Sequence, residues 1–380
     1  NADSSSELYY FDIDNTGLRI ALVYPCLRIV RVWSKNGTNW VQVGDNILLD
    51  NINLSSSLYG GLDFKQTKIA MTGDGNGLVI GFSLLPNPGV ESGGYGGIVI
   101  QYSYVNNSWQ KKGNIDIIGT WVSSFSGQEP SAVANVKNAA WSLYTENSYI
   151  SGDHIYPSSI SITDNGDKFI VGWDKYTTTT TANLGGAFIY EWNNNIPELK
   201  KSVIGDASQY IDVGKVVKIS SDGNNAYVLK KNTSNNDYSI LYFTFNVIWT
   251  FQNISSPTIP NIPQIATSFW ANDAGLMYYD DNDNKIKLII KDSSSSFSEK
   301  YSISGGDGEI GSLKNIYHNQ PLSSNSSIGH NDNPKLTTAV IKPGSLSGGQ
   351  WAYPTIEIRE ATIEGPIANI HKTINLSGYG

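Results

Sequence analysis

The chain has 380 residues, of which 39% are hydrophobic, 11% aromatic and only 16% charged, and its formal net charge is −8. This composition argues against a disordered chain, and its scattered basic residues argue against nucleic acid as a partner. No apolar run approaches the roughly 18 residues that a membrane-spanning helix needs.

The first predicted element is a hairpin at residues 10–23, in which an alternating strand reaches a turn at Gly17. Near copies lie at residues 68–81, 159–172 and 217–228, and in these copies Asp or Asn precedes the turn glycine. That pair suits the positive φ of a tight hairpin turn. The second strand of each copy is more continuously apolar, which predicts a strand covered on both faces. The anchors, each four residues before a turn glycine, are Ile13, Met71, Ile162 and Ile219.

A second hairpin follows each copy, at residues 27–40, 96–109 and 185–195, with looser versions at 238–251 and 284–297. Each combines an aromatic-rich strand with an Asn-rich turn and a further strand. The unit is therefore four strands in two hairpins. Degenerate anchors are expected near Phe269 and Val340.

Four-stranded units repeated six or seven times predict an all-β fold, a single β-propeller over residues 1–380 with antiparallel blades. Seven blades are preferred. The interval from Met71 to Ile162 is too long for one unit. The alternative is therefore six blades with an insertion at residues 120–155 and a long loop at 305–335.

The segment "MTGDGNGLVIGF", followed by "GGIVIQYSYVNNSWQKKGN", resembles the FG-GAP-type, integrin-α-like propeller repeat of bacteria and large DNA viruses. The match covers residues 10–119 and 155–230 and is poor beyond about residue 260. The resemblance implies a propeller for surface recognition or assembly, usually without catalysis.

The calcium-binding members of that family carry a D-x-D-x-D-G loop, and no full copy stands in this sequence. The turn with Asp280, Asp281 and Asp283 offers oxygen ligands for Ca²⁺ but lacks the glycine of such loops. We therefore expect an ordinary hairpin turn there, with a calcium site as the alternative, and predict no other cofactor.

No nucleophile motif is present, and no catalytic residue is predicted. Two pairs are the candidates if there is an active site. Asp12 and Asp14 make one face of the first strand acidic, as a channel-facing glycosidase pair would. His318 and His330 share one long loop, as a proton-transfer pair of a polysaccharide lyase could. An exposed strand face and a polar surface loop are the structural alternatives.

Trp40, Trp109 and Trp192 recur at matched places in the repeat, which predicts packing between blades. Four rings outside the pattern are candidates for stacking on sugars or anchoring a protein: Tyr95, Trp121, Trp173 and Tyr176.

Cys26 is the only cysteine, so no intrachain disulfide can form, and its apolar surroundings predict a small buried side chain. Because the sequence does not start with Met, export is an expectation. Seven N-x-S/T sequons are glycosylation candidates on a eukaryotic secretory route: Asn36, Asn53, Asn106, Asn232, Asn253, Asn325 and Asn375.

The leading functional hypothesis is a non-catalytic surface or assembly protein, such as a virion component, filament subunit or exported adhesin. It would bind proteins or copies of itself and would be extracellular, on the cell surface or in a virion. One alternative is a glycan-binding propeller that uses loop aromatics. Another is a carbohydrate-active hydrolase or lyase with its site at the channel mouth.

Overall fold

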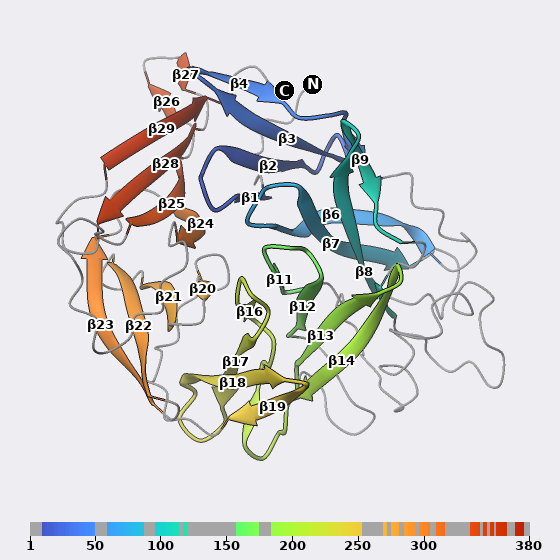
Figure 1. Cartoon of the computed structure of the whole chain (residues 1–380), viewed down its shortest axis with the longest axis vertical. Coiled ribbons are helices and arrows are strands. Elements are labelled where there is room, and N and C mark those ends of the chain that lie inside the picture. Colours follow the sequence, from blue (N-terminus) through green and yellow to red (C-terminus); the bar gives the residue numbers. More distant parts are fainter. Residues whose placement is uncertain are drawn as a thin grey trace.

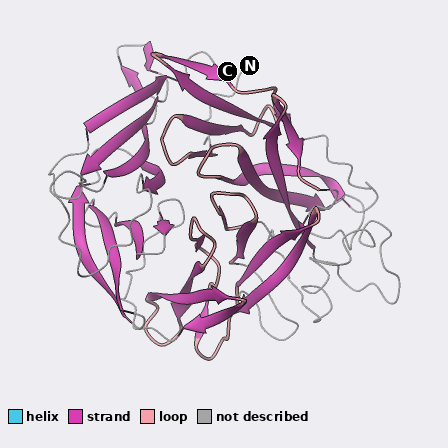
Figure 2. Cartoon of the chain, in the orientation of Figure 1, coloured by secondary structure: helices cyan, strands magenta, loops and turns pink. Residues whose placement is uncertain are grey.

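A computed structural model describes residues 10–49, 67–82, 98–113, 157–174 and 184–252 with their side chains, and strands alone at 59–66, 83–86, 96–97, 117–120 and between 269 and 375. Every regular element in these parts is a β-strand (Figure 2). The described residues contain no helix that could cross a membrane. The all-β prediction is confirmed.

The described strands form six antiparallel sheets and one short hairpin. The first sheet contains β1 (Tyr10–Ile13), β2 (Arg19–Tyr24), β3 (Ile29–Asn36), β4 (Asn39–Gln42) and β5 (Ile47–Leu48), and the second contains β6 (Tyr59–Met71), β7 (Gly77–Pro86), β8 (Gly96–Val105), β9 (Ser108–Lys111) and β10 (Ile117–Thr120). The third contains β11 (Ser159–Ile162), β12 (Lys168–Trp173), β13 (Gly186–Asn193) and β14 (Ile196–Ile204), and the fourth contains β15 (Tyr210–Ile211), β16 (Val217–Ile219), β17 (Asn225–Asn232), β18 (Tyr238–Asn246) and β19 (Ile248–Gln252). The fifth contains β20 (Phe269–Ala271), β21 (Gly275–Asp280), β22 (Lys285–Ser293) and β23 (Ser296–Ser304), and the sixth contains β24 (Glu309–Asn315), β25 (Lys335–Lys342), β28 (Thr355–Thr362) and β29 (Asn369–Asn375), while β26 (Ser345–Ser347) pairs with β27 (Gln350–Ala352).

Three sheets contain five strands, because in each of them two short strands occupy one strand position. In the first sheet β4 and β5 both pair with β3, and in the second β9 and β10 both pair with β8. In the fourth sheet β15 and β16 both pair with β17. Each sheet is therefore a four-stranded unit of two hairpins, as the repeat predicts.

The sheets are arranged in a ring, and the strands nearest its centre are β1, β6, β11, β16, β20 and β24 (Figure 1). The innermost strands contact one another in a closed series: β1 with β6, β6 with β11, β11 with β16, β16 with β20, β20 with β24, and β24 with β1. Antiparallel four-stranded sheets in this arrangement are a β-propeller. The choice between seven and six blades stays a prediction, since residues 121–156, with most of the expected insertion, lie outside the described residues.

The core lies between neighbouring sheets, and the second strand of a blade contributes to it from both faces. In β7, Leu78 and Ile80 pack with residues of the first sheet, whereas Val79 packs with residues of the third. In β12, Phe169 belongs to the cluster shared with the second sheet, and Ile170 belongs to the cluster shared with the fourth. The continuous apolar runs are therefore explained by burial on both sides.

The four anchors Ile13, Met71, Ile162 and Ile219 are buried, as predicted. The four turn glycines also adopt the expected left-handed conformation, with φ between 64° and 73°. The alternating strands and glycine turns of the sequence thus produce the innermost hairpin of four blades.

The structure corrects the predictions for Cys26, for the loop at 305–335 and for Val340. Cys26 is exposed, because β2 ends at Tyr24 and the chain turns through Pro25, with the Arg28 N–H donating to the Pro25 carbonyl at 3.1 Å. Proline fixes φ and has no N–H for the strand ladder, so the apolar run breaks there. Strand β24 (Glu309–Asn315) lies within the predicted loop at 305–335, of which residues 305–308 and 316–334 are outside the described residues. Because β24 pairs with β25, Val340 lies in the second strand of its sheet and is not an anchor of a first strand.

Candidate functional site

Two kinds of hairpin turn reach the same face of the ring. The inner turns join the first and second strands of a blade, and the outer tips join the third and fourth. In each of four blades a main-chain N–H near the end of the third strand donates to a carbonyl of the inner turn, as from Lys35 to Leu18 at 2.8 Å. The equivalent donors Tyr104, Trp192 and Phe245 bind Asn76, Asp167 and Asn224. This face is the candidate functional surface.

The inner turns of the second, third and fourth blades repeat the same pattern of hydrogen bonds. In the second blade, Thr72 Oγ1 accepts from the Gly77 N–H at 2.7 Å and donates to Asp74 Oδ1 at 2.7 Å, and the Asn76 N–H donates to the same carboxylate oxygen. Thr163 with Asn165, and Ser220 with Asp222, repeat these contacts in the next two blades. The hydroxyl and the acid or amide two residues later are therefore parts of the turn.

The hydrogen bonds of the inner turn change the pKa of the Asp74 carboxyl group. Partial burial raises its pKa, but the hydrogen bonds from Thr72 and Asn76 and the charge of Arg19 outweigh burial, so the pKa lies below its ordinary value. Asp74 is thus a carboxylate held by donors, which suits a structural acceptor better than a proton donor.

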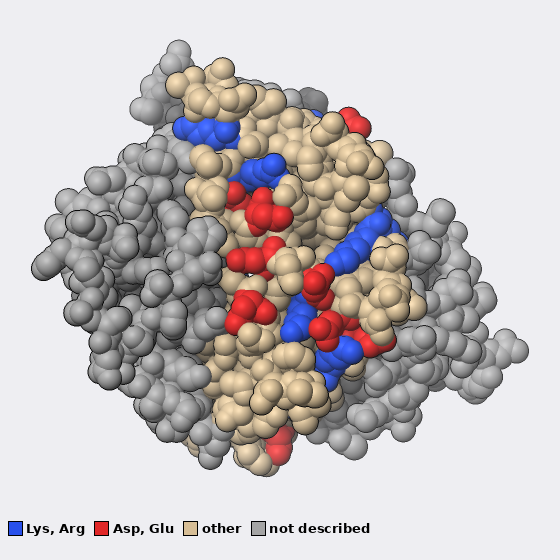
Figure 3. Space-filling model, in the orientation of Figure 1, with Lys and Arg blue, Asp and Glu red and all other residues tan. Residues whose placement is uncertain are grey.

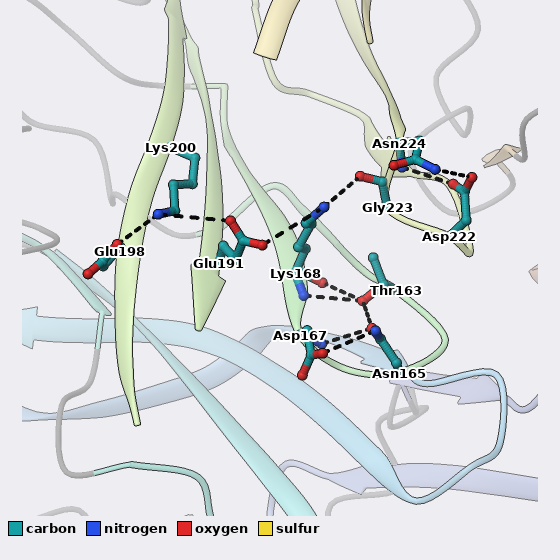
Figure 4. A network of polar contacts seen from close by, with 10 residues as sticks. All are labelled: Thr163, Asn165, Asp167, Lys168, Glu191, Glu198, Lys200, Asp222, Gly223 and Asn224. Atoms are coloured by element: carbon teal, nitrogen blue, oxygen red, sulfur yellow. Dashed lines mark hydrogen bonds and ion pairs between the residues drawn. The ribbon is translucent and has the colours of Figure 1, made fainter. Parts of the chain in front are cut away.

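Cationic side chains link three of the inner turns to the preceding blade. Arg19 donates to the Gly75 carbonyl at 3.2 Å, Lys112 to that of Gly166 at 3.0 Å, and Lys168 to that of Gly223 at 3.3 Å. In the third blade Lys168 also lies 3.9 Å from Glu191, which in turn faces Lys200 (Figure 4). The turn carbonyls are therefore clamped from the preceding blade.

Lys112 shows the contacts of one of these clamps in detail. Its ammonium group lies 5.1 Å from the centroid of the Trp192 ring and 3.7 Å from Asp167. Burial lowers the pKa of Lys112, while Asp167 opposes that shift. The clamp therefore combines a carbonyl, a carboxylate and a ring face.

The inner turns of three blades meet at the middle of this face. Asn15 Nδ2 of the first blade donates to Asp164 Oδ2 of the third at 3.0 Å. A Cβ on Gly73 of the intervening blade would lie 2.3 Å from Asp164 Oδ1, so glycine leaves the space for this contact. Acidic side chains cover the middle of the face (Figure 3), and the exposed carboxylates of these turns are Asp74, Asp167 and Asp222.

The two candidate acids of the first strand both accept structural hydrogen bonds. Asp12 accepts from the main-chain N–H of Met71 in the next blade at 2.8 Å. Asp14 is buried and accepts from the Arg19 N–H at 2.9 Å and from Thr16 Oγ1 at 2.5 Å. Asp12 thus bridges two blades and Asp14 fixes its own turn.

Trp109 and Trp192 pack between blades, as the repeat predicts. Trp109 Nε1 donates to the Val43 carbonyl of the first blade at 2.8 Å, and Trp192 Nε1 donates to Gln101 of the second at 2.5 Å. A Cβ on Gly113 would lie 2.7 Å from the Trp192 ring, and one on Gly44 would lie 3.1 Å from the Trp109 ring. These two glycines therefore admit the tryptophan of the following blade. Trp40 packs within the first sheet's own cluster.

Trp173 is corrected from a candidate binding ring to a core residue. Its side chain is 2% exposed and lies in the cluster between the second and third sheets, so its ring is not available to a ligand. The other candidate rings, Tyr95, Trp121 and Tyr176, and the histidines His318 and His330, lie outside the described residues.

The structure describes some of the residues of the candidate calcium site and some of the glycosylation sequons. Asp280 ends β21 opposite Lys285, which confirms a hairpin at this point, while Asp281 and Asp283 lie outside the described residues. The described side chains include no group of three His, Cys, Asp or Glu that could hold a metal ion. Among the sequons, Asn36 and Asn106 lie exposed at outer tips and Asn232 is half-buried at the end of β17, Asn375 ends β29, and Asn53, Asn253 and Asn325 lie outside the described residues.

An exposed apolar group on the outer hairpin of the fourth blade was not predicted from the sequence. Val247 is 86% exposed, Ile248 68% and Phe251 47%, and Val247 has a φ of 70°. A β-branched residue in this conformation costs about 1–2 kcal/mol. The available signal was the stretch from Tyr238 to Gln252, which contains no charged residue.

No protein-family model and no curated protein matches the chain. The solved structures that match the chain do so at low similarity. The fucose-specific lectin from Aleuria aurantia is 10% identical, with a TM-score of 0.42 over 97% of this chain and 99% of that one. The β-propeller domain of Cps50 (Swd1) from Myceliophteria thermophila is also 10% identical, with a TM-score of 0.38 over 90% of this chain and 96% of that one.

The periplasmic gluconolactonase PpgL from Pseudomonas aeruginosa is 9% identical, with a TM-score of 0.39 over 91% of this chain and 92% of that one. Likenesses of this size carry no conclusion about activity. The propeller fold stands on the sheets and contacts of this chain.

Proposed function

We propose that this protein is a non-catalytic surface or assembly protein whose outermost strands make protein–protein contacts, in the first place with further copies of the chain. The observation that carries the proposal is strand β19. It is the outer edge of its sheet, and its side chains Ile248 and Phe251 are exposed.

Edge strands commonly avoid unwanted pairing by carrying lysine or proline. The outer strands β9, β14, β23 and β29 each contain a lysine, and β14 also contains Pro197. In contrast, β19 has the sequence IWTFQ and β4 has the sequence NWVQ, with neither lysine nor proline. The short outer pieces β5 (IL) and β10 (IIGT) also contain neither residue. An uncharged apolar edge of this kind supports pairing with another strand.

The carboxylates of the inner turns support a non-catalytic role. Asp12, Asp14 and Asp74 accept hydrogen bonds that hold turns or join blades. Their contacts account for the acidic residues without an acid–base reaction.

Sedimentation velocity of the full chain over a range of concentrations tests the proposal. We expect association that increases with concentration, and loss of that association in Ile248→Lys, which adds a charge to the edge. Leu18→Lys is the matched control, because Leu18 is also an exposed apolar residue, at 43%, but lies in an inner turn. A wild-type chain that stays monomeric, or an Ile248→Lys variant that associates as the wild type does, would contradict self-assembly through β19.

Two screens separate the alternative functions. Specific binding on a glycan array would favour a lectin. Turnover of a polymeric sugar that disappears in His318→Ala or Asp14→Asn would establish a carbohydrate-active enzyme and overturn the non-catalytic assignment.

The finer architecture belongs to the same proposal. In place of the seven blades preferred from the sequence, we favour six, because the six innermost strands of the described residues contact one another in one closed series. The FG-GAP-type resemblance, an extracellular, cell-surface or virion location, and calcium at the turn of Asp280, Asp281 and Asp283 remain expectations.

A further inference from the structure

The chain contains three Asn-Gly pairs, and all three lie in the described residues: Asn36-Gly37, Asn76-Gly77 and Asn165-Gly166. Glycine after asparagine permits the main-chain nitrogen to reach the asparagine side chain. The three pairs stand in turns of different kinds. Asn36-Gly37 is in the outer tip of the first blade, and the other two are in inner turns.

In the two inner pairs, hydrogen bonds hold both the asparagine side chain and the N–H of the following glycine. The Gly77 N–H donates to Thr72 Oγ1 at 2.7 Å, and the Asn76 side chain binds Asp74 at 2.9 Å and also binds Arg19. The Gly166 N–H donates to the Thr163 carbonyl at 3.1 Å, and Asn165 Oδ1 accepts from Thr163 Oγ1 at 2.7 Å.

The outer pair has none of these restraints. Asn36 is exposed, and no hydrogen bond of its side-chain amide or of the Gly37 N–H occurs with the described residues. A Cβ on Gly37 would meet no atom within 4 Å, whereas one on Gly77 would lie 2.6 Å from Thr72. The Asn36-Gly37 turn therefore has room to rearrange.

We propose that Asn36 is a site of spontaneous deamidation and that the inner turns protect Asn76 and Asn165 from the same reaction. The Gly37 nitrogen, after losing its proton to solvent base, attacks Cγ of Asn36, and the Cγ–Nδ2 bond breaks with release of ammonia. Water then opens the cyclic imide at either carbonyl, which yields aspartate or isoaspartate. The product places a new negative charge at the outer tip of the first blade.

Incubation of the folded full chain at mildly alkaline pH, followed by peptide mapping and isoaspartate detection, tests the proposal. At least two hydrogen bonds must break before either inner asparagine can react, so Asn36 should react roughly tenfold faster or more. In denaturant the three sites should react at similar rates. Equal rates at the three sites in the folded chain would overturn the proposal.

A variant tests the protective contact directly. Thr72→Val frees the Gly77 N–H, so reaction at Asn76 should increase while Asn165, whose own turn is unchanged, serves as the internal control. An unchanged rate at Asn76 in a folded Thr72→Val chain would show that this hydrogen bond does not protect the site.

Discussion

The inner turns and the outer tips of the first two blades use the same local chemistry in opposite surroundings. Gly75 in an inner turn has a φ of 71°, and Gly37 in an outer tip has a φ of 60°. A Cβ on Gly75 would lie 2.6 Å from Cδ of Arg19 in the preceding blade, whereas one on Gly37 would meet nothing within 4 Å. A glycine turn can therefore either join neighbouring blades or present a free tip, and the neighbours decide which.

The paired variants Gly75→Ala and Gly37→Ala sharpen this contrast and should give the largest effect. Positive φ costs alanine about 1–2 kcal/mol at both positions. At Gly75 the displaced Arg19 adds about 1–3 kcal/mol of overpacking. Chemical denaturation should therefore show a clearly larger loss for Gly75→Ala. Equal losses would mean that the packing between blades at this turn contributes little.

The hairpins and their repetition could be predicted because they depend on local residues. Alternation up to Ile13, Met71, Ile162 and Ile219, followed by a turn glycine, is visible without any tertiary information. Even the two-residue outer turns follow local rules, since Asn106 and Asn107 both adopt positive φ.

The roles of Asp12 and Trp173 depend on neighbouring blades, and sequence reasoning missed them. Asp12 alternates as a channel-facing acid would, but its partner is the main chain of Met71, distant in sequence. Trp173 falls outside the repeat pattern because it fills the core between two sheets. In the same way, no glycine follows β24 within ten residues of the sequence, so the repeat pattern does not identify this strand and only its pairing with β25 does.

A second matched pair concerns the hydroxyl group of the inner turn. Thr72→Val leaves the buried Gly77 N–H without its acceptor and should cost about 1–3 kcal/mol. Thr38→Val changes an exposed residue of the outer tip and should stay within about 0.5 kcal/mol. Thermal or chemical unfolding of both variants checks the difference. If Thr38→Val lowered the free energy of unfolding as much as Thr72→Val, the proposed difference between the inner turns and the outer tips would be wrong.

The smallest expected effect is a pH dependence at Asp74. Its pKa in the folded chain lies below the ordinary value, so the carboxylate contributes stability that is fully present above the unfolded pKa, about 3.9 for aspartate. That contribution is lost as the pH falls through the lower, folded pKa. Asp74→Asn removes the titrating group, and Asn165 at the equivalent place in the third blade shows that the turn accepts an amide.

Unfolding free energies of the wild type and Asp74→Asn, measured from neutral pH downward, give the test. The wild type should have its largest advantage near neutral pH, and the two curves should converge below the folded pKa. A difference that stays constant with pH would mean that the donors from Thr72 and Asn76 serve a neutral amide as well as a carboxylate. The inner turn would then be held by hydrogen-bond geometry alone, and Arg19 would act through its own hydrogen bonds to the Gly75 carbonyl and the Asn76 side chain.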